Sequence, residues 1–434
     1  MVSSILCVLL VILEITVAKT QSTGPVVKGL SYTFYDSTCP KLAAIIRNHL
    51  NQVFQRDITQ AAGLLRIHFH DCFVQGCDGS VLLDGSASGP SEQNAPPNLT
   101  LRPEAFKIIN DLQALVHRQC GQVVSCADIT ALAARDSVYL SGGPQYDIPL
   151  GRRDGLNFAT QAATLANLPR PTSNTTTLLD SLSTKKLDPT DVVALSGAHT
   201  IGRGHCTSFT SRLYPTQDPT MNQSFANSLK VTCPASDTSN TTVLDIRTPN
   251  KFDNKYYVDL MNRQGLFTSD QDLYTDKRTR AIVTSFAVNQ SLFFEKFVAA
   301  MIKMGQLSVL TGKQGEIRAN CSARNGNDMG LWSVKSRSVP QYGKLDYYWQ
   351  IDDDDNHQQN QWRNSQPQSK SYNFNGNYYN NRGFSAPGDP DGKRKKRVAS
   401  YNMYTVEGKL KSSVKNSFKW IKNKLSADHV SYDA

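Results

Sequence analysis

Nine cysteines, most of them spaced widely along the chain, constrain the fold of this 434-residue sequence more than any other feature. Cys7 lies in an apolar N-terminal stretch that is predicted to be a cleaved signal peptide. An even number of cysteines in a secreted protein indicates a set of disulfides, here four, formed in an oxidising compartment. Eight cysteines allow roughly 105 pairings, and spacing alone does not choose among them. The eight are Cys39, Cys72, Cys77, Cys120, Cys126, Cys206, Cys233 and Cys321.

The first 22 residues are predicted to be a signal peptide. An apolar run over 5–13 is followed by the small residues Thr16-Val17-Ala18, and the run is too short to span a membrane. No basic residue precedes this run and Glu14 interrupts its end, so an N-terminal core helix stays open as the alternative. Glycosylation sequons agree with secretion. They begin at Asn98, Asn174, Asn222, Asn240, Asn289 and Asn320.

From about Thr33 to Arg324 the apolar residues recur at helical rather than strand spacing, which predicts an all-α fold. Segment 127–140 keeps this pattern and ends just before Gly142, a residue typical of helix C-termini. Asp188 followed by Pro189 is typical of a helix start. The other predicted helices cover 61–73, 105–119, 254–264, 276–289 and 292–304.

After Arg324 the composition changes. Segment 325–392 is rich in Asn, Gln, Tyr and Ser and lacks the aliphatic residues that offset ordering entropy, so it is predicted to be a disordered linker. Segment 393–434 begins with five consecutive basic residues and continues as a predicted amphipathic helix. The last 110 residues carry 17 Lys+Arg against 11 Asp+Glu, which is six of the ten excess positive charges. The rest of the chain is only mildly basic, and this charge gives no reason to expect a nucleic-acid partner.

The run Arg66-Ile-His-Phe-His-Asp-Cys72 is the strongest sign of chemistry. Arg66 and His70 lie four residues apart and share one face of a helix. A fixed cation beside a titratable imidazole suits a site that takes up a proton and stabilises a developing negative charge. A zinc pair of His68 and His70 with Cys72 is an alternative, but residues two apart on a helix diverge by about 200° and cannot easily share a metal.

A second histidine, His199, follows a helical segment in Leu195-Ser-Gly-Ala-His-Thr200. Two histidines in separate helices, each with polar residues nearby, indicate a cofactor held between an axial ligand and an acid/base group. Taken singly, each histidine is more ordinarily structural.

These motifs, with several others in a fixed order, resemble the class III plant-type secretory haem peroxidases, of the horseradish peroxidase kind. The resemblance covers residues 33–324 and implies a haem peroxidase domain over 23–324. The further motifs are Gly76-Cys-Asp-Gly-Ser80, Val124-Ser-Cys-Ala-Asp128, Gly151-Arg-Arg-Asp154, Phe252-Asp-Asn-Lys-Tyr-Tyr257, Ser269-Asp-Gln271 and Gly315-Glu-Ile-Arg318.

The resemblance implies two helical domains with haem b between them. His199 would be the proximal iron ligand, and Asp270 would accept its second ring N–H and favour high-valent iron. His70 would move the proton of the bound peroxide, and Arg66 would stabilise the charge that builds as the O–O bond breaks. The enzyme would reduce hydrogen peroxide through a high-valent iron-oxo state and oxidise phenols by one-electron steps at the haem edge.

Four further residues acquire expected roles from the same resemblance. Asn98 would hold the other nitrogen of His70 and would itself be fixed by Glu92. Phe69 would cover the iron, and the backbone carbonyl of Pro169 would receive a phenol hydroxyl. A buried Asn98 implies that its sequon is unoccupied.

Two calcium sites and the disulfide pairing are also implied. The first site would use Asp71, Val74, Gly76, Asp78 and Ser80, and the second Thr200, Asp245, Thr248, Lys251 and Asp253, where Val74, Gly76 and Lys251 contribute carbonyls. The pairs would be Cys39–Cys120, Cys72–Cys77, Cys126–Cys321 and Cys206–Cys233.

The C-terminal stretch departs from this family, because 393–425 resembles a family of small uncharacterised plant proteins. Three explanations remain open: a gene model that joins two neighbouring genes, an extension removed near the basic run, and a module that binds an acidic membrane face or a helix-accepting partner. For the body, the alternative is a degenerate peroxidase that binds haem or calcium without turnover. We expect a monomer whose partners are hydrogen peroxide and phenols, in the cell wall or alternatively the vacuole.

Overall fold

The computed structural model describes residues 25–85, 91–236 and 239–326. The predicted signal peptide (1–22), nearly all of the predicted linker (325–392) and the basic helical segment (393–434) lie outside the described residues.

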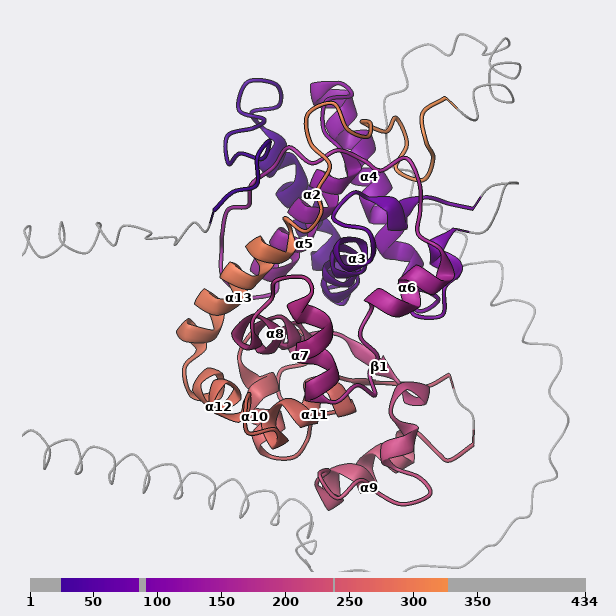
Figure 1. The fold of residues 1–434 in the computed structure, drawn as a ribbon, viewed down its shortest axis with the longest axis vertical. Helices are drawn as coiled ribbons and strands as arrows, with labels where there is room; N and C mark the ends of the chain where they lie inside the picture. The colour runs from indigo at the N-terminus through magenta and orange to yellow at the C-terminus, as the bar shows by residue number, and fades with distance from the viewer. Residues whose placement is uncertain (1–24, 86–90, 237–238, 327–434) are drawn as a thin grey trace, which may run out of the picture. The chain divides into compact units, whose positions relative to one another are not determined.

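Four helices of the N-terminal half pack together, three of them around α3 (Figure 1). They are α2 (Leu42–Arg56), α3 (Gln60–Val74), α4 (Pro103–Cys120) and α5 (Cys126–Leu140). Helix α3 packs most extensively on α5 and is buried around most of its circumference. A helix that is enclosed in this way holds its side chains in fixed positions, and α3 carries the motif that contains Arg66 and His70.

A second group of helices follows in the C-terminal half, in the lower part of Figure 1. It contains α7 (Thr175–Ser183), α8 (Pro189–Ser196), α10 (Lys255–Met261), α11 (Thr268–Thr275) and α12 (Arg280–Val288). Helix α13 (Gln290–Met304) packs on α8 and also contacts α3, so it joins the two groups. Helix α6 (Gln161–Asn167) lies against α3. The described part of the chain thus contains two groups of helices, and both belong to one compact unit.

The only two strands among the described residues form a small antiparallel ribbon. Strand β1 (Arg203–His205) pairs with β2 (Thr241–Val243), with Arg203 opposite Val243. Helix α9 (Gln223–Thr232) packs beside β2, around a separate small apolar core. The all-α fold class is confirmed, and no described helix combines the length and apolarity that crossing a membrane requires.

Side-chain caps explain where several helices begin. The Ser125 hydroxyl accepts the N–H of Asp128 at the start of α5. Asp188 caps α8 by accepting the N–H of Asp191, whose carboxylate in turn accepts the N–H of Asp188, each at 3.0 Å. The helix predicted to start at Asp188-Pro189 is confirmed, with Pro189 as its first residue.

Other boundaries differ from the sequence prediction. The helix predicted for 254–264 ends at Met261, because Arg263 has a backbone φ of 60° that a helix cannot contain. The helix predicted for 276–289 begins only at Arg280, after a turn in which the Asp276 carboxylate accepts the N–H of Arg278. Helices α2, α6, α7, α9 and α11 were not predicted. All but α2 have ten residues or fewer, a length at which packing rather than local propensity stabilises a helix.

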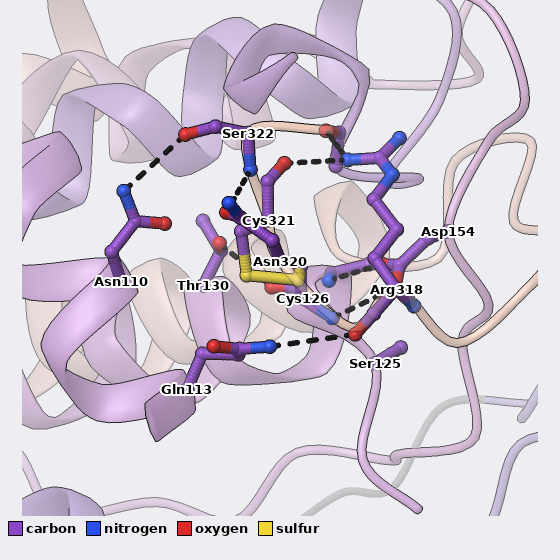
Figure 2. The surroundings of a disulfide bond; sticks show 12 residues. Asn110, Gln113, Ser125, Cys126, Thr130, Asp154, Arg318, Asn320, Cys321 and Ser322 are labelled. Atoms are coloured by element: carbon purple, nitrogen blue, oxygen red, sulfur yellow. Dashed lines mark hydrogen bonds between the residues drawn. A yellow bond between two sulfur atoms is a disulfide. The ribbon is translucent and has the colours of Figure 1, made fainter. Parts of the chain in front are cut away.

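The described residues contain four disulfides, and they are the four that the resemblance implies: Cys39–Cys120, Cys72–Cys77, Cys126–Cys321 and Cys206–Cys233. Figure 2 shows the longest-range link, Cys126–Cys321, which joins the start of α5 to a residue near the end of the described ranges. Beside it the Asp154 carboxylate accepts the backbone N–H groups of Cys126 and Arg318. The guanidinium of Arg318 donates to the carbonyl of Cys321. The disulfide is thus embedded in a buried polar network.

Removing Cys126–Cys321 with a double alanine variant is expected to destabilise the protein more than removing Cys206–Cys233. The two links span 195 and 27 residues. Loop-closure entropy in the unfolded chain gives about 5 kcal/mol for the first and about 3.5 kcal/mol for the second. Urea unfolding of both double variants measures the difference, and an equal or reversed order would contradict the prediction.

Candidate active site

Helix α3 places Arg66 and His70 in direct contact. They lie one helical turn apart, and Nε of Arg66 donates to Nε2 of His70 at 3.2 Å. The ring of Phe69 packs edge-on against the His70 ring, with 5.1 Å between ring centres. The sequence prediction that Arg66 and His70 share one helix face is therefore realised as a hydrogen-bonded pair.

The loop before α4 determines the tautomer of His70. The amide nitrogen of Asn98 donates to the backbone carbonyl of Glu92 at 2.8 Å, which turns its oxygen toward Nδ1 of His70 at 2.6 Å. An amide oxygen can only accept, so Nδ1 carries the proton and Nε2 is unprotonated, with a lone pair that accepts the N–H of Arg66. Glu92 acts on Asn98 through its backbone, while its carboxylate accepts the N–H of Ala159 at 2.7 Å.

The surroundings keep His70 neutral. Burial and the adjacent Arg66 guanidinium lower the pKa of His70 from 6.5 to about 3, against the opposing effect of Asn98. Burial also lowers the pKa of Arg66, to about 10, which leaves the side chain cationic near neutral pH. A neutral imidazole beside a fixed cation can accept a proton while the cation stabilises negative charge.

Thr100 also belongs to this site, and sequence reasoning missed it. The guanidinium of Arg66 donates to the carbonyl of Thr100 at 2.8 Å, to its hydroxyl at 2.9 Å and to the carbonyl of Pro97 at 3.1 Å. No local sequence signal marks this contact, because Thr100 lies 34 residues after Arg66 in the chain.

His199 lies in a short 3₁₀ segment, Gly197–Thr200, that directly follows α8. Its Nδ1 donates to Oδ1 of Asp270 at 2.7 Å, and Asp270 is held in the first turn of α11. The His199 side chain is 36% exposed whereas that of Asp270 is 2% exposed. Among the described residues none hydrogen-bonds Nε2 of His199, so this nitrogen is available to a metal. An imidazole backed by a carboxylate is a donor set that fits haem iron.

The first candidate cation site surrounds the loop after α3. Oδ2 of Asp71 accepts the N–H of Gly79, and Oδ1 of Asp78 accepts the N–H of Ser80, both at 3.0 Å. Oδ1 of Asp71, the Ser80 hydroxyl and Oε1 of Glu92 are buried and have no hydrogen-bond partner within the described ranges. Unpartnered buried oxygens are costly unless an ion or a water satisfies them. Val74 is the last residue of α3, and Gly76 lies in the loop that follows, where its carbonyl accepts the N–H of Asp78 at 2.8 Å.

The charges around this loop also favour a cation. Arg318 is a buried guanidinium that faces four carboxylates, those of Asp71, Asp78, Glu92 and Asp154. Burial, with the neighbouring carboxylates, raises the pKa of Asp71 well above its usual value and that of Glu92 to about 7. A bound divalent cation would offset this excess of negative charge.

The residues of the second candidate cation site are linked directly to one another by hydrogen bonds. The Thr200 hydroxyl donates to Oδ2 of Asp245 at 2.9 Å and lies 3.4 Å from the Lys251 carbonyl. The Thr248 hydroxyl lies 3.0 Å from Oδ1 of Asp253. The structure therefore brings together all five residues predicted for this site.

Neither candidate cation site has the ligands of a zinc centre. No cluster of three or more His, Cys, Asp or Glu able to hold a metal occurs in the described part of the chain. Both candidate sites instead combine two carboxylates with hydroxyl and carbonyl oxygens, a mixture that Ca²⁺ accepts. Cys72 forms a disulfide and has no thiolate to offer, so the zinc alternative with His68 and His70 is disfavoured. His68 is buried against the sulfur of Cys72.

Pro169 follows Leu168, the C-cap residue of α6, and is half-buried. Within the described ranges no backbone N–H bonds to its carbonyl. The carbonyl is thus free to accept a hydrogen bond from outside the protein.

Comparison with known proteins places this site in a family. Residues 46–289 match the family described as Peroxidase. The chain is 68% identical over 307 residues to "Peroxidase 12" of Arabidopsis thaliana, covering 71% of this chain and 86% of that protein. It is 61% identical over 313 residues to "Cationic peroxidase SPC4" of Sorghum bicolor, with the same coverage of each. With "Peroxidase 42" of Zea mays it shares 46% over 299 residues, 69% of this chain and 91% of that protein.

A second family accounts for the end of the chain. Residues 387–431 match the family described as Domain of unknown function (DUF3511). The resemblance of the C-terminal segment to a family of uncharacterised proteins is confirmed. The resemblance of the body is confirmed as well, and the chain belongs to the plant peroxidase family.

Proposed function

We propose that this peroxidase is a secreted enzyme that uses haem b to reduce hydrogen peroxide and oxidises phenolic donors one electron at a time. The observation that carries the proposal is the tautomer of His70: its Nε2 is unprotonated, beside a fixed guanidinium. Four disulfides support an oxidising compartment. We expect the cell wall as the destination, with the vacuole as the alternative, and a monomer.

On the distal side, Nε2 of His70 takes the proton from the attacking peroxide oxygen and returns it to the departing oxygen. Asn98 keeps Nδ1 protonated through both transfers, so that Nε2 remains the reactive nitrogen. Arg66, held by Thr100 and Pro97, stabilises the negative charge on the departing oxygen. Bound haem b would supply the iron that binds the peroxide and that transfers the oxidising equivalents of the peroxide to the donor.

On the proximal side, Nε2 of His199 would ligate the iron, and Asp270 would orient the ring and increase its donor strength. Phe69 beside His70 would restrict access to the iron, and donors would react at the haem edge. The free carbonyl of Pro169 would accept the donor's phenol hydroxyl.

Two calcium ions would complete the enzyme. Asp71, Val74, Gly76, Asp78 and Ser80 would bind one of them, and the unpartnered oxygens of Asp71 and Ser80 support this assignment. Thr200, Asp245, Thr248, Lys251 and Asp253 would bind the other.

One absorption spectrum combined with one assay tests the proposal. The purified protein should show a Soret band and peroxide-dependent oxidation of guaiacol. A Soret band without phenol oxidation would identify the degenerate peroxidase, and bound zinc without a Soret band would identify the zinc alternative.

The Asn98 sequon is expected to carry no glycan. Asn98 is 3% exposed, and the nitrogen that a glycan would occupy donates to Glu92. Asn174, whose oxygen caps α7 while its nitrogen has no partner among the described residues, is the matched comparison. Glycopeptide mass spectrometry of the secreted protein measures both sites, and glycan on Asn98 would rule out its role beside His70.

For the C-terminal segment we propose that two neighbouring genes have been joined. The two family matches are separate, and the second begins only at residue 387. A single transcript that spans the codons around Arg324 would exclude this explanation and leave a processed extension or a binding module.

A further inference from the structure

Asp270 has a second partner besides His199. Tyr256, on α10, directs its hydroxyl to Oδ1 of Asp270 at 3.0 Å. The same oxygen accepts the N–H of His199 at 2.7 Å, while Oδ2 accepts the backbone N–H of Phe267 at 2.9 Å. Tyr256 and His199 therefore share one carboxylate oxygen.

The direction of the Tyr256 hydrogen bond follows from its surroundings. Burial and the Asp270 carboxylate raise the pKa of Tyr256 well above its usual value of 10.0, so the hydroxyl is neutral and donates. The side chain is 1% exposed, and its ring packs edge-on against those of Tyr257 and His199. Within the described ranges its hydroxyl has no other acceptor, so its contact with Asp270 is fixed by packing.

Two donors on one oxygen compete for its electron density. The hydroxyl of Tyr256 stabilises charge on Oδ1 and so weakens the pull of this oxygen on the His199 proton. Partners of a ligating histidine are known to set ligand strength. A weaker pull makes the His199 ring less anionic and a poorer donor to a bound metal.

We propose that Tyr256 is a positioning residue that sets the donor strength of His199 through the shared oxygen of Asp270. This inference rests on the proposed role of His199 as the iron ligand. Tyr256 itself touches neither substrate nor cofactor in this proposal and acts only through Asp270.

The test is Tyr256→Phe in the haem-loaded enzyme. With its competitor removed, Oδ1 of Asp270 should accept the His199 proton more strongly. The iron–histidine stretch of the ferrous protein should then move to higher frequency, and the ferric/ferrous reduction potential should become more negative. Resonance Raman spectroscopy and a redox titration measure these two shifts without reference to turnover.

Tyr257→Phe is the matched control. Tyr257 is the next residue, is equally buried, and its hydroxyl donates instead to the carbonyl of Val193 at 2.8 Å. It should leave both signals at the wild-type values. Asp270→Asn, which weakens the acceptor, should move the stretch to lower frequency and the potential to more positive values.

Two different outcomes distinguish a failure of the proposed iron ligand from a failure of the proposed role of Tyr256. A wild-type protein without an iron–histidine band that depends on His199 would overturn the proposed ligand. A shift in Asp270→Asn with Tyr256→Phe identical to Tyr257→Phe would overturn the role of Tyr256 alone. If Tyr256→Phe does not fold, fluorotyrosine can be incorporated into the Tyr257→Phe variant instead. Fluorination makes the Tyr256 hydroxyl a stronger hydrogen-bond donor, so the iron–histidine stretch must move to lower frequency. An unchanged frequency in this protein would contradict the proposal.

Discussion

Replacing His70 with alanine is expected to lower the second-order rate constant for reaction with hydrogen peroxide by about two to four orders of magnitude. The variant loses the only imidazole nitrogen in the described part of the site that is both unprotonated and paired with Arg66. Proton transfer would then depend on water, while the charge of Arg66 remains in place. Stopped-flow spectroscopy of the Soret band gives this rate constant directly.

His68→Gln is the matched control for this experiment. His68 lies on the same helix two residues earlier, is equally buried, and contacts the sulfur of Cys72 rather than Arg66 or Asn98. Its peroxide rate constant should stay close to that of the wild type once haem content is equalised. If the two variants lose the same activity at equal haem content, the assignment of His70 as the proton carrier is wrong.

Removal of calcium is expected to reduce turnover and Soret absorbance together. Asp71 directly follows His70 and Thr200 directly follows His199, so each proposed ion would brace one histidine. A ligand present at 100 times its dissociation constant contributes about 2.7 kcal/mol to the free energy of unfolding. Chelation should remove a contribution of this size for each occupied site, and urea unfolding with and without calcium measures it.

Single substitutions assign the calcium effect to one site or the other. Asp78→Asn weakens the first proposed site and Asp245→Asn the second. Asp36→Asn is the control, because it removes the same charge from an exposed carboxylate in neither cluster. Unchanged turnover in protein shown by metal analysis to be free of calcium would refute the coupling between the ions and the histidines.

Much of the distal site could be predicted from the sequence because its geometry is local. Arg66 and His70 lie within one helix, and a spacing of four residues brings them together wherever that helix forms. The start of α8 was equally predictable, because Asp188 and Pro189 act within a single turn.

Other contacts of the site leave no such local pattern. Asn98 donates to the backbone carbonyl of Glu92. Every residue has such a carbonyl, so the residue type at position 92 does not indicate this contact. Thr100 meets Arg66 across 34 residues of sequence, and Tyr256 meets Asp270 only because α10 and α11 pack together. Short helices such as α6 were missed for the same reason, since tertiary packing and not their own sequence stabilises them.

The link between Cys126 and Cys321 has a practical consequence for anyone who wishes to produce this enzyme. Just beyond Cys321, the Arg324 guanidinium donates to the carbonyl of Leu156 at 3.0 Å, and the Asn325 side chain bonds Ile317 and Ala319. The catalytic body is thus fastened to the preceding fold, covalently at Cys321 and by hydrogen bonds at Arg324 and Asn325. A shortened gene that stops after codon 326 should encode an autonomous folding unit, and the same position should accept a purification tag or a cleavable linker.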